Sequence, residues 1–584
     1  MGVPGFFKWL IENYNKDNFV FNKDKINNPE LLEKIGSIDW FLIDANCLLH
    51  PKCFEILAEN PDFKNLLSLE NKMMDHAIAY IDKLINYVKP REGVYLAIDG
   101  CAPLAKSKQQ RSRRFKSIHD NEMWDSIKKK YKKPINKKWN NSAITPGTVF
   151  MERLHFKILE WAKTKEIKLI YSSCQTPAEG EHKLLQFIRE NIKKNINFNY
   201  VMYGLDADLI FLCLSTNADN MFLLREAQEF DKKHSKEELN YVSIDIMRNS
   251  IKTSIERIIN VGRDEDDFEV IDSKYDNNII NDFILICYFL GNDFLPHLPA
   301  LDIYEDGLDI LLNKYVELLS KYNYKKFLID RKKTTLKINN KLFIEFISLL
   351  ASEESENLKN KFLKKRKYYK CKSSDQYDIH VHRVENVMFK VKDPIQLGSD
   401  ESDLWKVRYY QHYFHLREEE SVEFIDTLVY NYLMGLMWTT KYYFDKCCSW
   451  SWYYPFNNPP FLEDIMSFFE KNPTFDINKI VFNIDKPLKP FNQLMLVLPS
   501  QSSYLVPDAL KNLMTNPSSE LSFMYPRKIE QDFIGKYRYW MAIPKLPPVD
   551  INLLKMVYEK NEKKIKKKDL NRNKKQNPFK FNIN

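Results

Sequence analysis

Short apolar runs that end in polar or acidic residues recur through the first three hundred positions. Examples are "WFLID", "GVYLAID", "IKLIYSS" and "YVMYGLDADLIFLCLS". Amphipathic segments of helix length, such as "MMDHAIAYIDKLINYV", lie between them. This alternation predicts an α/β fold with a largely parallel sheet flanked by helices. Sites in such sheets form beyond the carboxyl ends of the strands, where the acids of these runs fall.

The pattern changes along the 584 residues, a length greater than one hydrophobic core usually supports. We predict a catalytic domain in residues 1–325 and a lysine-rich linker or peripheral segment in residues 326–400. Residues 401–560 are again aromatic, which indicates a second, aromatic-rich module packed on the first or an elaboration of it. The basic, low-complexity residues 561–584 are typical of a disordered tail.

Composition narrows the class of protein. The formal net charge of +9 is mildly basic for this length and permits a polyanionic partner without proving one. The nine cysteines include no CxxC pair, which argues against a zinc module or a disulfide framework and for a reducing compartment. The N-terminus lacks a signal-peptide pattern, and the apolar runs are too short to span a bilayer. We therefore expect a soluble intracellular monomer that does not act at a membrane.

Seven acids at predicted strand or helix ends are candidates for one site. Along a strand, residues i and i+2 share a face, so "DAD" would aim its two acids together. "AEGEH" opens a helix, and in "LGNDF" Gly291 is placed to end a helix before the acid. The candidate residues are Asp44, Asp99, Glu179, Glu181, Asp206, Asp208 and Asp293.

The convergence of seven carboxylates would require countercharge. Hard oxygen ligands suit Mg²⁺, with Mn²⁺ as a substitute, and two such ions can hydrolyse a phosphodiester. Any single aspartate is more often a cap of a helix or turn. The whole set, at the ends of one α/β unit, favours a two-metal site in which all seven acids are catalytic and metal-binding.

A basic stripe follows Asp99 directly. Lys106, Gln110, Arg113 and Arg114 fall at i, i+4, i+7 and i+8, on one face of a predicted helix. Such a stripe is often only a solvated face. Beside a metal site, it would form a receptor for a terminal phosphate.

Three aromatic side chains have two interpretations each. His50 follows Asp44 by six residues and is either an ordinary histidine or a platform for a nucleobase. Trp450 and Trp452 in "SWSW" are either packing residues or stacking residues, and their spacing does not choose between them.

At this point the motifs resemble the Xrn-type 5′→3′ exoribonuclease family, in a short form that ends after the second conserved block. The first block contains "LIDANCLLH", "AIDGCAPLAKSKQQRSRRFKS", "PAEGEHK", "YGLDADLI" and "LGNDFLPHLP". The second contains "VRYYQHYF", "MGLMWTTKYYFDKCCSWSWYYPF", "LMLVLPSQSSYLVP" and "WMAIPKLPPVD". The resemblance covers most of the chain to about residue 560.

The resemblance implies a nuclease core like those of PIN domains and flap nucleases, completed by the second block. It implies processive hydrolysis of 5′-monophosphorylated single-stranded RNA to nucleoside 5′-monophosphates, in RNA decay or processing. The seven acids would hold two Mg²⁺ ions, the basic stripe would hold the 5′-monophosphate, and His50 with one of the two tryptophans would stack on the terminal base.

Two alternatives stay open. A flap endonuclease acting on DNA shares the acidic core, and a non-catalytic RNA-binding module would keep only the binding surfaces. The cytoplasm is the favoured compartment. The nucleus is the alternative, because the basic C-terminal residues could act as a nuclear address.

Overall fold

The computed structural model describes residues 6–14, 19–227, 238–332, 335–364, 367–399, 404–417, 421–536 and 538–582. Within these ranges the main sheet has eight strands in the order β1-β7-β6-β5-β2-β3-β4-β12. Their bounds are β1 Val20–Phe21, β2 Trp40–Asp44, β3 Gly93–Ala97, β4 Lys168–Ser172, β5 Tyr200–Tyr203, β6 Met221–Glu226, β7 Leu239–Ser243 and β12 Phe579–Phe581.

The five central strands are parallel. β2 lies between β3 and β5, with Trp40 paired to Gly93 on one side and to Tyr200 on the other. β4 and β6 extend this parallel set, whereas β7, β1 and β12 join antiparallel at the edges. All five residues of β2 and of β3 are buried. Burial on both faces explains why these strands are continuous apolar runs rather than alternating ones.

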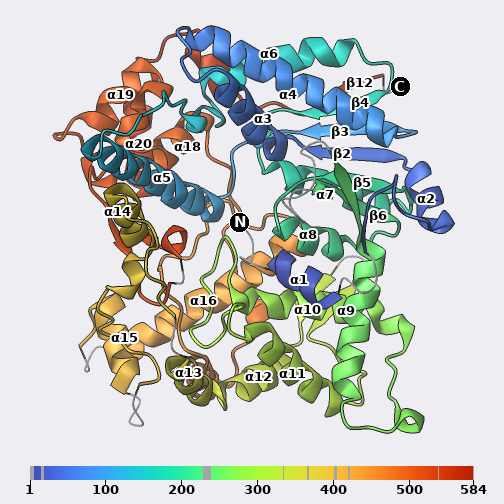
Figure 1. Cartoon of the computed structure of the whole chain (residues 1–584). Helices are drawn as coiled ribbons and strands as arrows, with labels where there is room; N and C mark the ends of the chain where they lie inside the picture. The colour runs from blue at the N-terminus through green and yellow to red at the C-terminus, as the bar shows by residue number, and fades with distance from the viewer. Residues whose placement is uncertain are drawn as a thin grey trace.

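Helices cover both faces of the sheet (Figure 1). On one face, Phe41 and Leu96 pack with α3, α4 and α6. On the other, Leu42 and Tyr95 pack with α7, α8, α9 and α10. The helices of this half are α1 Phe6–Tyr14, α2 Pro29–Gly36, α3 Ala45–Glu59, α4 Leu66–Val88, α5 Leu104–Lys130, α6 Val149–Lys163, α7 Gly180–Lys193, α8 Asp208–Thr216, α9 Ile244–Ile259 and α10 Asp276–Cys287.

The rest of the chain is mainly helical. A two-stranded hairpin pairs β8 Ile329–Lys332 with β9 Thr335–Ile338, and a second pairs β10 Glu530–Asp532 with β11 Ile543–Lys545. The helices are α11 Gly307–Ser320, α12 Asn340–Ala351, α13 Glu354–Leu363, α14 Gln376–Glu385, α15 Leu404–Phe414, α16 Ser421–Phe444, α17 Leu462–Lys471, α18 Pro490–Val497, α19 Asp508–Thr515 and α20 Ile551–Glu562.

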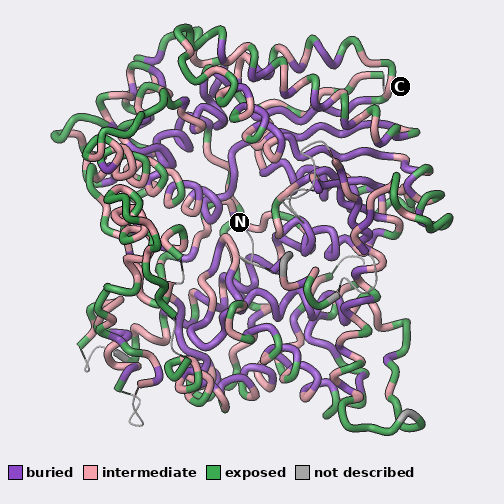
Figure 2. The backbone as a smooth tube through the Cα atoms, in the orientation of Figure 1, coloured by how far each residue is buried: buried purple, intermediate pink, exposed green. Residues whose placement is uncertain are grey.

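The core of this helical part is continuous with one face of the sheet. Buried side chains of α8 and α10 belong to the same apolar cluster as those of α12, α16 and α17. A separate cluster joins α18, α19 and α20 to Leu104 and Phe115 of α5. Figure 2 shows the buried backbone running from the strands into the helical part. In the described residues, no helix is both long and apolar enough to cross a bilayer.

Two descriptions in the predicted domain plan are wrong. Residues 326–400 include α12, whose Phe343 and Phe346 are fully buried in the main core, so this part is not a peripheral linker. Residues 561–582 are not a disordered tail, because β12 pairs with β4 and Arg572 is buried, donating to the carbonyl of Gly147 at 2.7 Å. Lysine-rich composition concealed the few apolar residues that anchor each segment. The boundaries themselves stay a prediction.

Candidate active site

Two acids stand at the ends of adjacent parallel strands. Asp44 ends β2 and caps α3, accepting hydrogen bonds from the Asn46 amide at 3.2 Å and the Cys47 thiol at 3.1 Å. Asp99 lies two residues beyond β3, where its Oδ2 accepts from the Asn46 side chain at 2.9 Å. The Asn46 side-chain carbonyl in turn accepts from the Asp99 amide at 3.1 Å. One asparagine thus joins the two strand ends.

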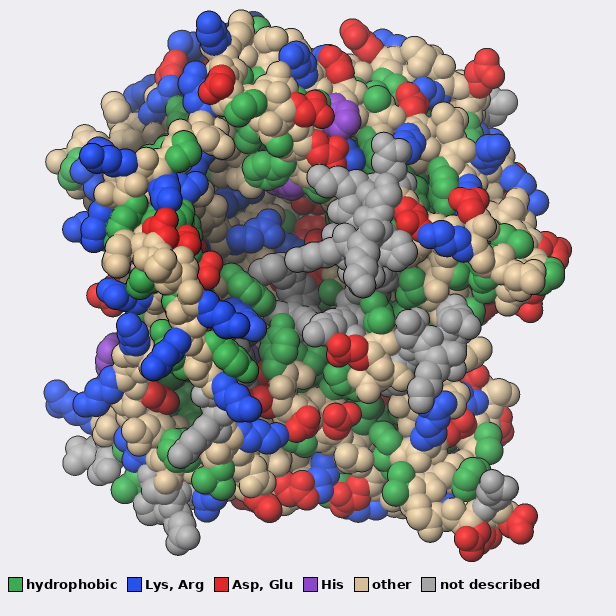
Figure 3. All heavy atoms as spheres, viewed as in Figure 1, with side chains coloured by type: hydrophobic (Ala, Val, Ile, Leu, Met, Phe, Trp, Pro, Cys, Tyr) green, Lys and Arg blue, Asp and Glu red, His purple; other side chains and the backbone are tan. Residues whose placement is uncertain are grey.

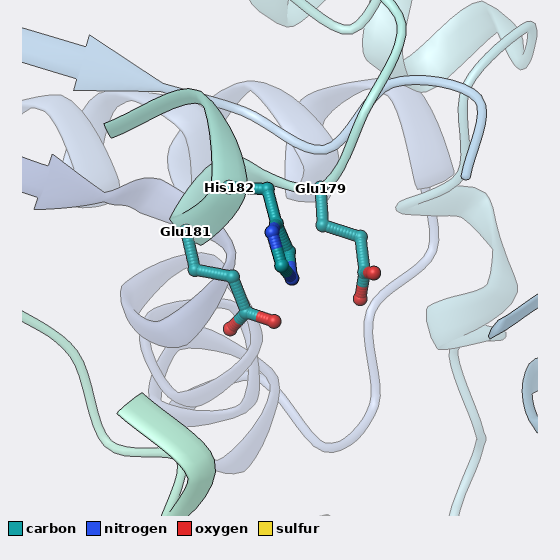
Figure 4. A group of neighbouring side chains, drawn as sticks. All are labelled: Glu179, Glu181 and His182. Atoms are coloured by element: carbon teal, nitrogen blue, oxygen red, sulfur yellow. The ribbon is translucent and has the colours of Figure 1, made fainter. Parts of the chain in front are cut away.

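The start of α7 brings two more acids to this edge. Glu179 is the N-cap residue and Glu181 lies in the first turn, as the sequence predicts. The Gly180 amide donates to Asp99 Oδ1 at 2.7 Å. A Cβ at position 180 would lie 2.6 Å from an Asp44 oxygen, so a side chain there would displace that carboxylate. Figure 4 shows Glu179, Glu181 and His182 leaving the helix start toward the same space.

The "DAD" stretch is not a strand. β5 ends at Tyr203, Asp206 lies in the loop that follows, and Asp208 is the first residue of α8. Asp206 is exposed and Asp208 is 3% exposed. The reasoning from a shared strand face was therefore wrong. The loop nonetheless places one carboxylate oxygen each from Glu181, Asp206 and Asp208 within 4.8 Å of one another.

Asp293 joins the site from the segment that follows α10. The helical run ends in a 3-10 turn, Tyr288–Leu290, capped by Gly291 at a φ of 84°. This confirms the predicted helix-ending role of Gly291, because a residue with a Cβ rarely adopts that conformation. The Asp293 side chain is 3% exposed, and Gln109 of α5 donates to it at 3.4 Å.

Each of the seven candidate acids interacts electrostatically with at least one other. Burial, and then the charge of Asp99, raise the pKa of Asp44 well above its ordinary value. Burial and Asp208 do the same for the pKa of Glu181. The interacting pairs form an unbroken series: Asp206–Asp44, Asp44–Asp99, Asp99–Glu179, Glu179–Glu181, Glu181–Asp208 and Asp208–Asp293.

Lys106 lies among these acids. Its ammonium is 2.5 Å from Glu179 and 2.8 Å from Asp293, with Glu181 at 4.0 Å. Burial by itself would raise the pKa of Asp293, but the Lys106 charge lowers it below the ordinary value. The sequence placed Lys106 with the basic stripe alone. In the structure, it joins that stripe to the acids.

The donor set fits divalent cations. Among the described residues, the side chains of two groups are close enough to share an ion: Glu179, Glu181 and His182, and Glu181, Asp206 and Asp208. Asp208 Oδ1 is buried and has no hydrogen-bond partner among the residues that the structure describes. An ionised oxygen is costly to bury in that state, and a hard cation would satisfy it.

The other members of the basic stripe lie on α5, as predicted. Gln110 is buried, and Arg113 is exposed. Arg114 is partly buried, and its Nη1 has no hydrogen-bond partner within the described ranges. Burial and then Arg113 lower the pKa of Arg114 to about 9. His50 on α3 interacts electrostatically with Arg113 and Arg114. Burial, followed by the charges of Arg113 and Arg114, lowers its pKa to about 4, so it is neutral near pH 7.

The two candidate tryptophans have different surroundings. The Trp452 ring stacks on the buried Trp438 ring, with centroids 5.1 Å apart. Trp450 has no ring contact with any described side chain, and its backbone carbonyl accepts from the Leu104 amide at the start of α5 at 2.8 Å. Asp485 holds the same turn by accepting from the Trp450 amide at 2.5 Å and the Ser451 amide at 2.9 Å.

Three residues of the site escaped the sequence analysis. Asn46 bridges two acids, Tyr442 of α16 donates to Glu179 at 2.7 Å, and Lys183 donates to the carbonyls of Ile98 at 2.5 Å and Ser173 at 3.0 Å. Asn46 and Lys183 directly follow the acidic motifs, so their position was a usable signal. Tyr442 lies in an aromatic run, and no sequence signal distinguished it from its neighbours.

Figure 3 shows a hollow near the middle of one face of the molecule, with basic side chains on its wall and acidic ones deeper inside. The same distribution appears in the contacts of α5, whose stripe runs from the acids at Lys106 to the exposed Arg113. One end of the stripe is therefore buried among the acids and the other end is exposed.

Comparison with known families covers nearly the whole sequence. The family described as "XRN 5'-3' exonuclease N-terminus" matches residues 1–227. The family described as "Xrn1 helical domain" matches residues 273–393 and 353–581. The chain belongs to the Xrn family. Its second matched part extends past the predicted limit near residue 560 and includes β12.

Curated relatives of this Xrn-family chain agree with that assignment. It is 31% identical over 630 residues to "5'-3' exoribonuclease 1" of Homo sapiens, covering 98% of this chain and 35% of the relative. It is 29% identical over 711 residues to "5'-3' exoribonuclease 2" of Arabidopsis thaliana, covering 98% of this chain and 68% of the relative. The chain thus spans about a third of the human relative's length.

Proposed function

We propose that this Xrn-family protein is a metal-dependent 5′→3′ exoribonuclease that removes nucleoside 5′-monophosphates from 5′-monophosphorylated RNA. The observation that carries the proposal is the meeting of seven carboxylates from five separate chain segments beside an arginine-bearing helix. The relatives' names, which describe 5′-3′ exoribonucleases, support the direction and the RNA substrate.

The acids supply the ligands. Asp44, Asp99, Glu179, Glu181, Asp206, Asp208 and Asp293 would together hold two Mg²⁺ ions, or Mn²⁺ in their place. Bound there, such ions activate a water molecule and stabilise the leaving oxygen of a phosphodiester. Asn46 and the Gly180 amide hold Asp44 and Asp99 in place, so that these carboxylates need little rearrangement on binding.

The basic stripe would determine which phosphodiester of the RNA reaches the acids. Gln110, Arg113 and Arg114 would bind the 5′-phosphate. The Arg114 Nη1, which has no partner among the described residues, is a donor for it. Lys106 lies between the acids and the rest of the basic stripe. Its positive charge would neutralise either the carboxylates of Glu179 and Asp293 or the bound phosphate. A terminal phosphate held on α5 positions the first phosphodiester over the acids.

Two rings would enclose the terminal base. His50 is neutral and beside Arg113, and we assign it as one platform. Trp450 is the better candidate for the other, because one face of Trp452 is already packed on Trp438. The compartment in which the enzyme acts, cytoplasmic or nuclear, stays a prediction.

The test compares three RNAs that differ only at the 5′ end, carrying a monophosphate, a hydroxyl or a triphosphate, and a DNA flap. We expect mononucleotide release from the monophosphate in Mg²⁺, with the double variant Asp206→Ala, Asp208→Ala inactive. Cleavage of the flap at its junction would favour the endonuclease, and binding without any release would favour the non-catalytic module. Equal release by wild type and double variant would refute the site.

A further inference from the structure

Tyr442 is a buried tyrosine of α16 that contacts the acidic site from the helical part. It is 2% exposed, and its hydroxyl donates to Glu179 Oε1 at 2.7 Å. The other Glu179 oxygen, Oε2, meets Lys106 at 2.5 Å. Each oxygen of this carboxylate is thus engaged by a different element. A carboxylate held from two sides has a fixed orientation, which is what a metal ligand requires.

The Tyr442 ring is enclosed by residues from both sides of the site. The His182 ring stacks on it with centroids 3.6 Å apart and an angle of 22°. The Phe294 ring meets it edge-on at 5.6 Å, and the Trp438 ring lies 4.7 Å away. His182 follows Glu181, and Phe294 follows Asp293. One side chain therefore touches a neighbour of each of two acids that are 112 positions apart in the sequence (181 and 293).

His182 has a structural use in this arrangement. Its imidazole is buried and packs face to face on the phenol ring of Tyr442. The stack fixes the first turn of α7, from which Glu179 and Glu181 project (Figure 4).

We propose that Tyr442 is a positioning residue: it orients Glu179 through its hydroxyl and braces the α7 start and the Asp293 segment through its ring, so that the acids bind divalent cations tightly only while α16 is docked. This inference rests on the proposed function, because it assigns the acids to metal binding. It makes the helical part a component of the metal site rather than only a cover over the substrate.

The test uses the full chain and Mn²⁺ as the probe. Tyr442→Phe removes the hydroxyl and keeps the ring. We expect Mn²⁺ affinity, measured by calorimetry without RNA, to fall about tenfold, as loss of an outer-sphere partner typically does. The Mg²⁺ concentration for half-maximal RNA degradation should rise in proportion, with kcat at saturating Mg²⁺ and KM for RNA nearly unchanged.

Tyr432→Phe is the matched control. Tyr432 lies on the same helix, is fully buried, and donates to the Pro296 carbonyl at 3.3 Å rather than to an acid. Its loss should leave Mn²⁺ affinity unchanged. If Tyr442→Phe binds Mn²⁺ as wild type does, the proposal is wrong, and equal losses in both variants would also contradict it, since that pattern indicates a general effect on α16.

A double-mutant cycle makes the test independent of stability. In a Glu179→Gln background, Tyr442→Phe should change Mn²⁺ affinity by much less than in the wild type. Additive effects would overturn the proposed coupling. Failure of the proposed function gives a different result: a wild-type protein that binds Mn²⁺ but degrades no RNA would refute the activity and leave the Tyr442–Glu179 coupling measurable.

Discussion

Two buried aspartates of this protein have opposite surroundings. Asp282 of α10 is fully buried and fully paired, accepting from the Leu328 and Ile329 amides at 2.7 Å each and from the Tyr315 hydroxyl at 2.9 Å. Asp208 is 3% exposed, has an oxygen with no hydrogen-bond partner in the described part of the chain and lies among other acids. The paired carboxylate holds the fold, whereas a buried carboxylate among other acids is a candidate for a ligand-binding role.

Two arginines of α5 differ at their terminal nitrogens. Arg111 donates through Nη1 and Nη2 to the carbonyls of Leu496 and Met524 and lies over the Phe115 ring at 4.3 Å, although its Nε is without a partner in the described part of the chain. Arg114, one turn away, has an Nη1 with no hydrogen-bond partner among the same residues. On one helix, then, one guanidinium anchors the α18 region, and the other is the one we propose for the substrate.

Asp208→Asn tests the first contrast with the largest effect. Loss of a ligand charge should lower RNA degradation at least about a hundredfold. Without metal, the variant should unfold at a higher temperature than wild type, because a buried charge that repels its neighbours has been removed. Activity assays and thermal unfolding in a chelator measure the two. A less stable and fully active variant would reverse our assignment.

Asp282→Ala should have the opposite profile. Two backbone amides and a phenol would lose their acceptor in a dry interior, costing about 3 kcal/mol of unfolding free energy. Urea unfolding measures that loss. At a temperature where the variant is folded, its kcat should match wild type, and a selective loss of metal affinity would place Asp282 with the site after all.

Replacing the two arginines sharpens the second contrast. Arg114→Met should reduce the preference for a 5′-monophosphate over a 5′-hydroxyl about tenfold, through loss of a charge-assisted hydrogen bond. Arg111→Met should leave that preference unchanged and lower the unfolding temperature. Competition between the two RNAs in one reaction measures the preference. The same preference in both variants would show that α5 does not read the phosphate.

The smallest expected effect is a pH dependence. Burial raises the pKa of Asp282 to about 7, from an ordinary value of 3.8. Between these pH values the folded chain holds a proton that the unfolded chain has lost, so this group's contribution to stability falls as pH rises. The side-chain amide that Asp282→Asn introduces does not titrate. The difference in unfolding free energy between wild type and Asp282→Asn should therefore become smaller from pH 4 to pH 7. Urea unfolding measures this difference. A difference that stays constant over this pH range would contradict the raised pKa.

Several elements were predictable because their signals are local. The runs "WFLID" and "GVYLA" became β2 and β3 over those residues, since a strand buried on both faces must be apolar throughout. The basic stripe lies on α5, and Glu179 and Glu181 open α7, because capping and helical periodicity depend on nearby residues. The closeness of Asp44 and Asp99 was predictable because parallel strands end at a common edge.

The tertiary structure alone decided which charges are paired. Lys106 has the spacing of a phosphate ligand, yet contacts Glu179 and Asp293, which lie 73 and 187 positions further along the sequence (106 to 179 and 293). Asp208 was expected on a strand face shared with Asp206, but β5 ends at Tyr203 and Asp208 begins α8. β12 and Tyr442 act through partners hundreds of residues away. Periodicity records which side of an element is buried, but which partner satisfies a polar group depends on packing between distant segments.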